Sequence, residues 1–142
     1  MEKVKVKLIT LGHLPIELDK RKVEKYKSDI FEITRNIEQY NLNSDSNGEN
    51  CEFSDEIMRN EVPKIENGNI LIAIVNVPLE LDWYTRRVRE NVIVFTFHEI
   101  KEYLLFNNIP LENVIYRLIY AYSIVYTRTG GRIPINNELF ES

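Results

Sequence analysis

The sequence predicts a single α/β domain over residues 1–142, with a small mixed sheet packed by helices and a long core helix near the C-terminus. Two runs, 70–75 and 92–95, are apolar at every position, which is typical of central strands covered on both faces. The first of these strands is expected to reach residue 77. Apolar residues then recur at helical spacing over 110–128, so we expect these segments to share one core.

The composition is that of an ordinary globular protein, with 44% apolar and 28% charged residues. A net charge of −4 argues against a general binder of phosphate backbones, although it allows a local basic patch. The single cysteine, Cys51, cannot form an internal disulfide, and the N-terminus lacks an apolar leader. We therefore expect a cytoplasmic protein with no membrane segment, and the heavy use of Asn, Ile and Lys favours a bacterial or phage source.

The first segment alternates apolar and basic residues, because Lys5 and Lys7 separate Val4, Val6 and Leu8. Such alternation is typical of a strand with one buried and one solvated face. Lysines on the solvated face also discourage pairing with a further strand. We therefore expect an edge strand, followed by a turn.

Residues 19–40 have two interpretations. Apolar residues recur at a three-to-four spacing across the whole segment, which favours one long helix: Val23, Tyr26, Ile30, Ile33, Ile37 and Tyr40. The alternative ends the helix near Lys27 and places a strand over 30–34, where β-branched residues are frequent. The regular spacing makes the single helix our expectation.

A polar segment separates this region from the central strands. Residues 41–53 are rich in Asn, Ser and acidic side chains, which predicts a flexible acidic loop. The wider acidic stretch from Glu38 to Glu61 is expected to be a solvated surface, and docking on a basic partner is the alternative. Ser54 is suited to cap a short helix that Pro63 ends.

A further short helix is expected over 97–106, directly after the second central strand. Thr96 and Glu99 have the spacing of a capping box. In that motif the hydroxyl accepts a backbone N–H of the first turn, and the carboxylate accepts the N–H of the capping residue.

The helix over 110–128 is specified at both ends. Asn108 or Ile109 can serve as its N-cap, Pro110 suits the first turn, and Gly130 with Gly131 ends it. Its buried stripe is expected to consist of Val114, Ile115, Leu118, Ile119, Tyr122, Val125 and Tyr126. The opposite side is expected to carry Asn113, Tyr116, Arg117, Tyr120, Ser123 and Thr127.

Metal-binding motifs are incomplete. A zincin helix places two histidines four residues apart, whereas Glu102 stands four residues after His98, and the only other histidine is His13. The stretch 43–48 resembles the start of a calcium loop, but Ser54 stands where such a loop needs its bidentate glutamate. No metal and no cofactor is therefore predicted.

The segment 83–89 is the most suggestive candidate for a binding site. It brings the only tryptophan and three arginines together in what we expect to be a loop: Trp83, Tyr84, Arg86, Arg87 and Arg89. Aromatic rings interleaved with arginines can stack on bases and pair with phosphates. In the alternative, the tryptophan closes the edge of the core and the arginines pair with Asp82 and Glu90.

A second candidate surface lies on the long helix. Tyr116, Arg117 and Tyr120 are expected on its exposed side, where they can extend the first surface or mediate self-association. The tail over 132–142 shows no strong element and is a further candidate for partner surface.

The opening segment 7–15, Lys-Leu-Ile-Thr-Leu-Gly-His-Leu-Pro, precedes a helix, and with the order of elements it resembles small zincin-like proteins of the archaemetzincin type. In that family a central helix after the sheet carries the metal ligands. The matching helix of this chain, over 111–127, has no histidine, and the family's cysteine-rich C-terminal part has no counterpart. The resemblance therefore implies a fold that has lost the family's chemistry, and no functional residue is carried over from it.

The sequence pattern contains no set of reactive side chains sufficient for catalysis. We therefore expect a non-catalytic intracellular binding protein, such as an accessory or inhibitor protein of a bacterium, phage or mobile element. Its expected partner is another protein or a second copy of itself. Two alternatives stay open: a nucleotide or nucleic-acid binding module that uses 83–89, and a degenerate or atypical metal-dependent hydrolase.

Overall fold

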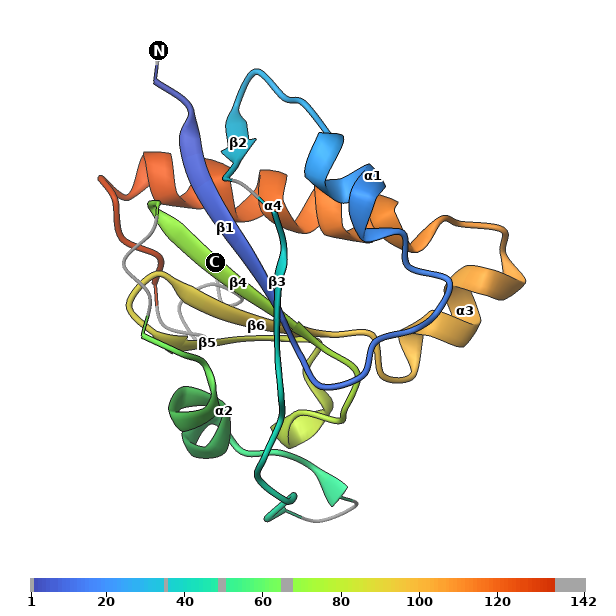
Figure 1. Ribbon diagram of the computed structural model, residues 1–142. Helices are drawn as coiled ribbons and strands as arrows, with labels where there is room; N and C mark the ends of the chain where they lie inside the picture. Colours follow the sequence, from blue (N-terminus) through green and yellow to red (C-terminus); the bar gives the residue numbers. More distant parts are fainter. Residues whose placement is uncertain (1, 35, 49–50, 65–67, 135–142) are drawn as a thin grey trace.

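A mixed six-stranded sheet lies at the centre of the molecule, with helices on both of its faces (Figure 1). The computed structural model describes residues 2–34, 36–48, 51–64 and 68–134, without the side chain of Asp82. The strands are β1 (Val4–Leu11), β2 (Phe31–Ile33), β3 (Glu38–Tyr40), β4 (Ile70–Val75), β5 (Thr85–Arg89) and β6 (Val92–Thr96). Their order is β2-β1-β4-β6-β5, and β3 pairs with the end of β1. The predicted α/β class with a mixed sheet is confirmed.

Each face of the sheet has its own apolar core. Along β1, Val4, Val6 and Leu8 face one core, whereas Ile9 and Leu11 face the other. The first core is covered by α1, α3 and α4, and the second is covered by α2 (Figure 1). The helices are α1 (Lys20–Lys25), α2 (Asp55–Glu61), α3 (Ile100–Phe106) and α4 (Leu111–Arg128), and a 3-10 turn, η2 (Glu80–Asp82), follows β4.

The predicted central strands occupy the centre of the sheet. β4 pairs in parallel with β1 on one side and with β6 on the other, and all six of its residues are buried. Unbroken apolar runs suit this position because side chains on both faces of the strand enter a core. None of the described helices has the length and apolar character needed to cross a membrane.

The prediction that β1 is an edge strand is wrong. β1 lies inside the sheet, with β2 and β3 paired along one side and β4 along the other. Lys5 is exposed as expected, but Lys7 is only 2% exposed. The ammonium of Lys7 lies 2.6 Å from a carboxylate oxygen of Glu38 on β3. A partner 31 residues away therefore allows a lysine inside the sheet.

The single helix predicted over 19–40 is wrong, and the alternative with a strand is confirmed. Helix α1 ends at Lys25, because Tyr26 adopts an extended conformation. β2 then pairs in parallel with the beginning of β1, and Phe31 is buried in the first core. Pairing with a distant strand overrides the local spacing of apolar residues, which fits a helix equally well.

The capping box predicted for α3 is also wrong. Thr96 is the last residue of β6, and its hydroxyl donates to the carbonyl of Val77 and accepts the N–H of His98. Glu99 adopts a left-handed conformation with φ of 70° and makes no capping hydrogen bond. For α2, in contrast, the predicted cap is confirmed, because the hydroxyl of Ser54 accepts the N–H of Ile57 at 3.2 Å.

Helix α4 buries a somewhat different face from the one predicted. Its start is displaced to Leu111, with Pro110 in the capping position, and it ends before Gly130 and Gly131, which have positive φ as predicted. The buried face consists of Leu111, Glu112, Ile115, Ile119, Tyr122 and Ser123. Ser123, expected on the exposed side, is fully buried, so the face that α4 turns toward the core differs from the predicted stripe.

Two predicted segments are described only in part. The acidic loop over 41–53 ends at Phe53, which is buried and forms a bridge with Leu79. The tail is described as far as residue 134, and Ile133 is buried in the first core. Residues 49–50 of the loop and 135–142 of the tail lie outside the described residues, and the flexibility of the loop and the partner surface on the tail stay predictions.

Candidate functional site

The segment 83–89 forms a strand, so the prediction of a loop is wrong. Thr85–Arg89 is β5, the antiparallel edge strand, which pairs with β6 and changes register between Arg87 and Arg89. Only Val88 is buried in this strand, so the sequence lacks the apolar pattern by which a strand is recognised. Trp83 and Tyr84 stand just before the strand and are exposed.

Arg86 is held against helix α2. Its Nε and Nη2 atoms lie 2.9 Å and 2.6 Å from the two carboxylate oxygens of Asp55. The hydrogen bonds to Asp55 raise the pKa of Arg86. The guanidinium also lies 5.9 Å from the ring centroid of Trp83, within the range of a cation–π contact. The partner of Arg86 is therefore Asp55, which is not one of the two partners, Asp82 and Glu90, predicted for these arginines.

Arg89 completes the C-terminal end of α2. Its Nη1 donates to the carbonyls of Arg59 and Val62, each at 2.9 Å, and its Nη2 donates to the carbonyl of Pro63 at 3.0 Å. The last carbonyls of a helix have no partner within the helix, so a guanidinium can satisfy them. Burial lowers the pKa of Arg89. In return, Arg59 donates its Nε to the carbonyl of Val88 on β5 at 2.7 Å.

The arginines of β5 therefore dock α2 on the edge of the sheet. Trp83 and Arg87 have partners within the molecule as well. Because these hydrogen-bonding groups already have partners, β5 has fewer donors left to bind a phosphate.

The second predicted surface lies at the other edge of the sheet. Tyr116 stacks on Tyr26, and Tyr26 stacks on Phe31 of β2, whereas 83–89 belongs to the β5 edge. β1, β4 and β6 separate these two edges. The structure therefore does not bring the two predicted surfaces together.

The three aromatic rings form a stack that joins the end of α1, strand β2 and helix α4. The ring centroids of Tyr26 and Tyr116 are 3.8 Å apart at an interplanar angle of 13°, and those of Tyr26 and Phe31 are 5.9 Å apart at 17°. Burial, with the nearby carboxylate of Glu112 as a further cause, raises the pKa of Tyr116. A tyrosine hydroxyl is neutral at pH 7 and can both donate and accept a hydrogen bond.

A groove of about 560 Å³ opens beside this stack. We call it the tyrosine groove. It lies between the end of α1, the turn from α3 to α4, and the first turns of α4. Its lining residues are Tyr26, Leu104, Asn108, Ile109, Pro110, Asn113, Val114, Tyr116 and Arg117. Its volume is in the range of ligand sites, and it combines aromatic and aliphatic walls with two amides and one guanidinium.

Exposed aromatic side chains come from the two helices that frame the groove. Tyr103 and Phe106 of α3 are 65% and 86% exposed, and Tyr120, one turn beyond Tyr116 on α4, is 51% exposed. Arg117, next to Tyr116, is exposed as predicted. Two of the three residues predicted on this surface, Tyr116 and Arg117, line the groove, and Tyr120 lies beyond it on the same helix.

His98, the histidine of the incomplete zincin motif, lies beside Glu99. The Nε2 atom of His98 is 3.7 Å from a carboxylate oxygen of Glu99, and both side chains are largely solvated. Among the residues that the structure describes, no group of three or more His, Cys, Asp or Glu side chains is placed to hold a metal ion.

Tyr26 is the site residue that the sequence prediction missed. The sequence pattern places Tyr26 on the apolar stripe of a long helix, whereas in the structure Tyr26 follows the last residue of α1 and forms one wall of the groove. Its partner Tyr116 lies 90 positions away in the chain, so no local spacing could have paired them. An aromatic residue within a run of lysines was the only local signal.

Comparisons of this chain with protein-family models, with curated proteins and with solved structures found no match. The resemblance in layout to small zincin-like proteins therefore stays a prediction, and the function has to be argued from the surface of the molecule.

Proposed function

We propose that this protein is a non-catalytic binding protein that recognises a protein partner through the tyrosine groove. The observation that carries the proposal is the groove itself, framed by helices that expose Tyr103, Phe106 and Tyr120. Aromatic residues and arginine are enriched at the centres of protein interfaces. Exposed aromatic side chains on helices that border a hollow are typical of such a surface.

The groove is suited to binding because its walls are rigid. Tyr116 is fixed by its stack on Tyr26, and Val114 and Ile109 pack against the first core. A wall that is already ordered loses little side-chain entropy when a partner docks, so more of the interaction energy contributes to affinity. An aliphatic or aromatic side chain of the partner would pack between these walls, and Asn108 and Asn113 would bond its backbone.

The nucleic-acid alternative on 83–89 is less well supported. Arg86 faces Asp55, and Arg89 donates to three carbonyl groups of its own chain. An arginine already bonded to a carboxylate adds little to the attraction of a phosphate, because the pair is close to neutral. The alternative of a metal-dependent hydrolase lacks a ligand group among the described residues.

The single cysteine and the composition bear on where the protein acts. We include in the proposal that it is intracellular, as an accessory or inhibitor protein of a bacterium, phage or mobile element. Self-association through the tyrosine groove is the second form of the proposal, because the same apolar surface can take a second copy.

Affinity capture from an extract of the producing cell tests the proposal. The full chain would be compared with a Phe106→Ser, Tyr120→Ala double variant, whose two side chains are largely exposed, so that the fold is unaffected. We expect proteins that are retained by the full chain and lost from the double variant. The matched control is Tyr84→Ala, because Tyr84 is a similarly exposed tyrosine at the opposite edge of the sheet.

The control variant should retain the same proteins as the full chain. Equal capture by all three proteins would contradict the proposal. Light scattering of the full chain over a range of concentrations checks the second form, since self-association would make the apparent mass rise with concentration.

A further inference from the structure

We infer that the partner presents an acidic segment with one large apolar side chain, which binds across Tyr26. This inference rests on the proposed function and names the chemistry of the partner. It comes from a second hollow that shares a wall with the tyrosine groove and differs from it in charge.

The second hollow has a volume of about 350 Å³ and is called here the lysine hollow. It is lined by Lys3, Glu24, Lys25, Tyr26, Lys27, Ser28, Phe31, Glu32 and Ile33. Tyr26 lines both the lysine hollow and the tyrosine groove, so the two lie on either side of one side chain. The tyrosine groove supplies an apolar half and the lysine hollow a basic half, with the ring of Tyr26 between them.

The basic half is lined by more lysines than carboxylates. Glu24 lies among the lysines, but its Oε2 atom accepts the N–H of Ile37 at 2.6 Å, so this carboxylate serves the chain's own backbone. Glu32 is the other acidic residue and is exposed on β2. The three lysines outnumber these two carboxylates, and Arg117 adds a charge on the groove side.

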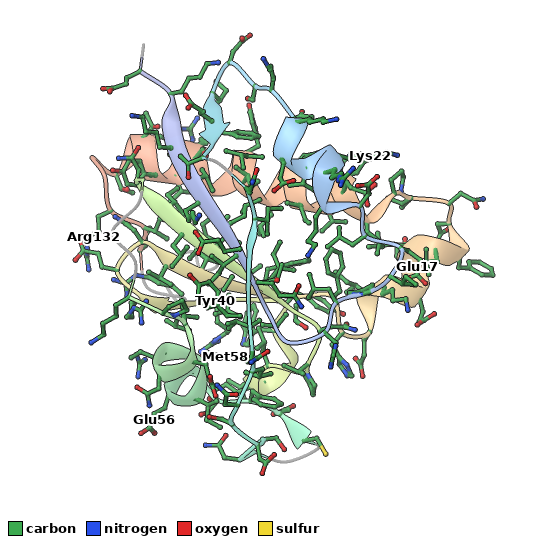
Figure 2. The ribbon with its side chains drawn as sticks, viewed as in Figure 1. Glu17, Lys22, Tyr40, Glu56, Met58 and Arg132 are labelled. Atoms are coloured by element: carbon green, nitrogen blue, oxygen red, sulfur yellow. The ribbon has the colours of Figure 1, made fainter. Side chains whose placement is uncertain are left out.

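Charge is also unevenly distributed over the whole molecule. The net charge is −4, yet the segment 20–27 has five basic residues and one acidic residue. Figure 2 shows Lys22 of α1 and Glu56 of α2 at opposite ends of the molecule. The lysine hollow therefore adjoins a basic segment of an acidic protein, whereas Glu112 and Asp19 lie near Tyr116 on the groove side. This difference in charge attracts the acidic residues of a partner to the lysines and orients the partner during approach.

A peptide fits this site better than a single-stranded nucleic acid does. Nucleic acids bind such surfaces by stacking bases on exposed ring faces. Tyr26 already stacks on both Phe31 and Tyr116, so it offers the edge of its ring and not a face. Carboxylates of a peptide can reach Lys25 and Lys27 while a neighbouring apolar side chain enters the groove.

Selection from a displayed library of random twelve-residue peptides tests the inference with the full chain as bait. We expect the selected peptides to combine Asp or Glu with one large apolar residue a few positions away. Their binding, measured by fluorescence anisotropy, should weaken about tenfold in a Lys25→Gln, Lys27→Gln variant, since each exposed ion pair contributes modestly. Asn113→Asp, which places a negative charge on an exposed residue of the groove lining, should weaken it as well.

The matched control is a Lys64→Gln, Arg132→Gln variant, which removes two exposed charges outside both hollows and should bind with unchanged affinity. Selected peptides without acidic residues, or no selected peptides at all, would overturn the inference. Tighter binding of a twelve-nucleotide oligothymidylate than of the best peptide would overturn it in favour of nucleic acid. If affinity capture succeeds and the partner binds equally well to the Lys25→Gln, Lys27→Gln variant, the proposed function stands and this inference fails.

Discussion

Lys7, Glu38 and Tyr40 form a polar group where β3 pairs with β1. Lys7 is buried, its ammonium contacts one oxygen of Glu38, and the hydroxyl of Tyr40 donates to the other at 2.6 Å. These contacts hold the pKa of Glu38 below its ordinary value of 4.5, mainly through the hydrogen bond from Lys7. A buried ammonium requires a partner of opposite charge, so the group ties β3 to β1.

Replacing Glu38 with glutamine should therefore reduce stability in a pH-dependent way. The folded-state pKa of Glu38 lies below the unfolded value, so its contribution is present above about pH 4.5 and is lost as the pH falls through the lowered pKa. We expect Glu38→Gln to unfold at lower urea concentration than the wild type at pH 7, and the difference to shrink towards about pH 3.

The control for this prediction is Glu90→Gln, which removes an exposed carboxylate. Its unfolding midpoint should stay close to that of the wild type at both pH values. A difference between Glu38→Gln and the wild type that is as large at pH 3 as at pH 7 would show that the ionised pair is not the cause.

At the scale of elements, α2 is attached to the sheet by side chains that the sequence did not pair. Arg86 reaches the first residue of this helix, and Arg89 reaches its last carbonyl groups. The helix has seven residues, so its own hydrogen bonds are few and its position depends on these contacts.

Substitution of Arg89 tests the attachment of α2. Arg89→Ala should lower the free energy of unfolding by about 1–2 kcal/mol, because three carbonyl groups lose a charged donor in a partly exposed position. Arg89→Lys should recover only part of the loss, because an ammonium lacks the planar fork that reaches several carbonyls. Urea unfolding measures both values, and equal stability of Arg89→Lys and the wild type would contradict this role.

Whether an element can be predicted from the sequence depends on the interactions that stabilise it. β4 and β6 could be predicted because both of their faces are buried and the apolar pattern records this directly. The sequence does not distinguish β2 from part of a helix, because a strand of three residues is too short to show a periodicity. Its conformation is determined by its pairing with β1. β5 is not predicted either, because a single buried side chain, Val88, gives no alternation of apolar and polar residues.

At the scale of the whole molecule, the central strands of the sheet are more buried and have more neighbouring strands than the strands at its edges. β4 is buried throughout and has a strand on each side, whereas β3 has three partly exposed residues and a single neighbour. We expect amide hydrogens of β4 to exchange with solvent at least about tenfold more slowly than those of β3, because β3 can open locally. Hydrogen exchange followed by NMR measures this directly, and equal protection of the two strands would contradict the layered stability described here.

The candidate site also depends on the whole fold, because its residues come from distant parts of the chain. Tyr116 and Arg117 could be predicted as surface residues from the helical period of α4. Their neighbour Tyr26 could not, because it is brought to them by the return of the chain from β1 through α1. The sequence therefore predicts part of one wall of the groove but not the groove.

The central claim, that a protein partner occupies the tyrosine groove, is tested most directly by photo-crosslinking in the producing cell. Benzoylphenylalanine would replace Phe106, at the end of α3, which contributes Leu104 to the groove, or Tyr84, at the opposite edge of the sheet. We predict a light-dependent crosslink to a defined protein from position 106 and none from position 84. Crosslinks from position 84 alone, or from neither position, would contradict the account.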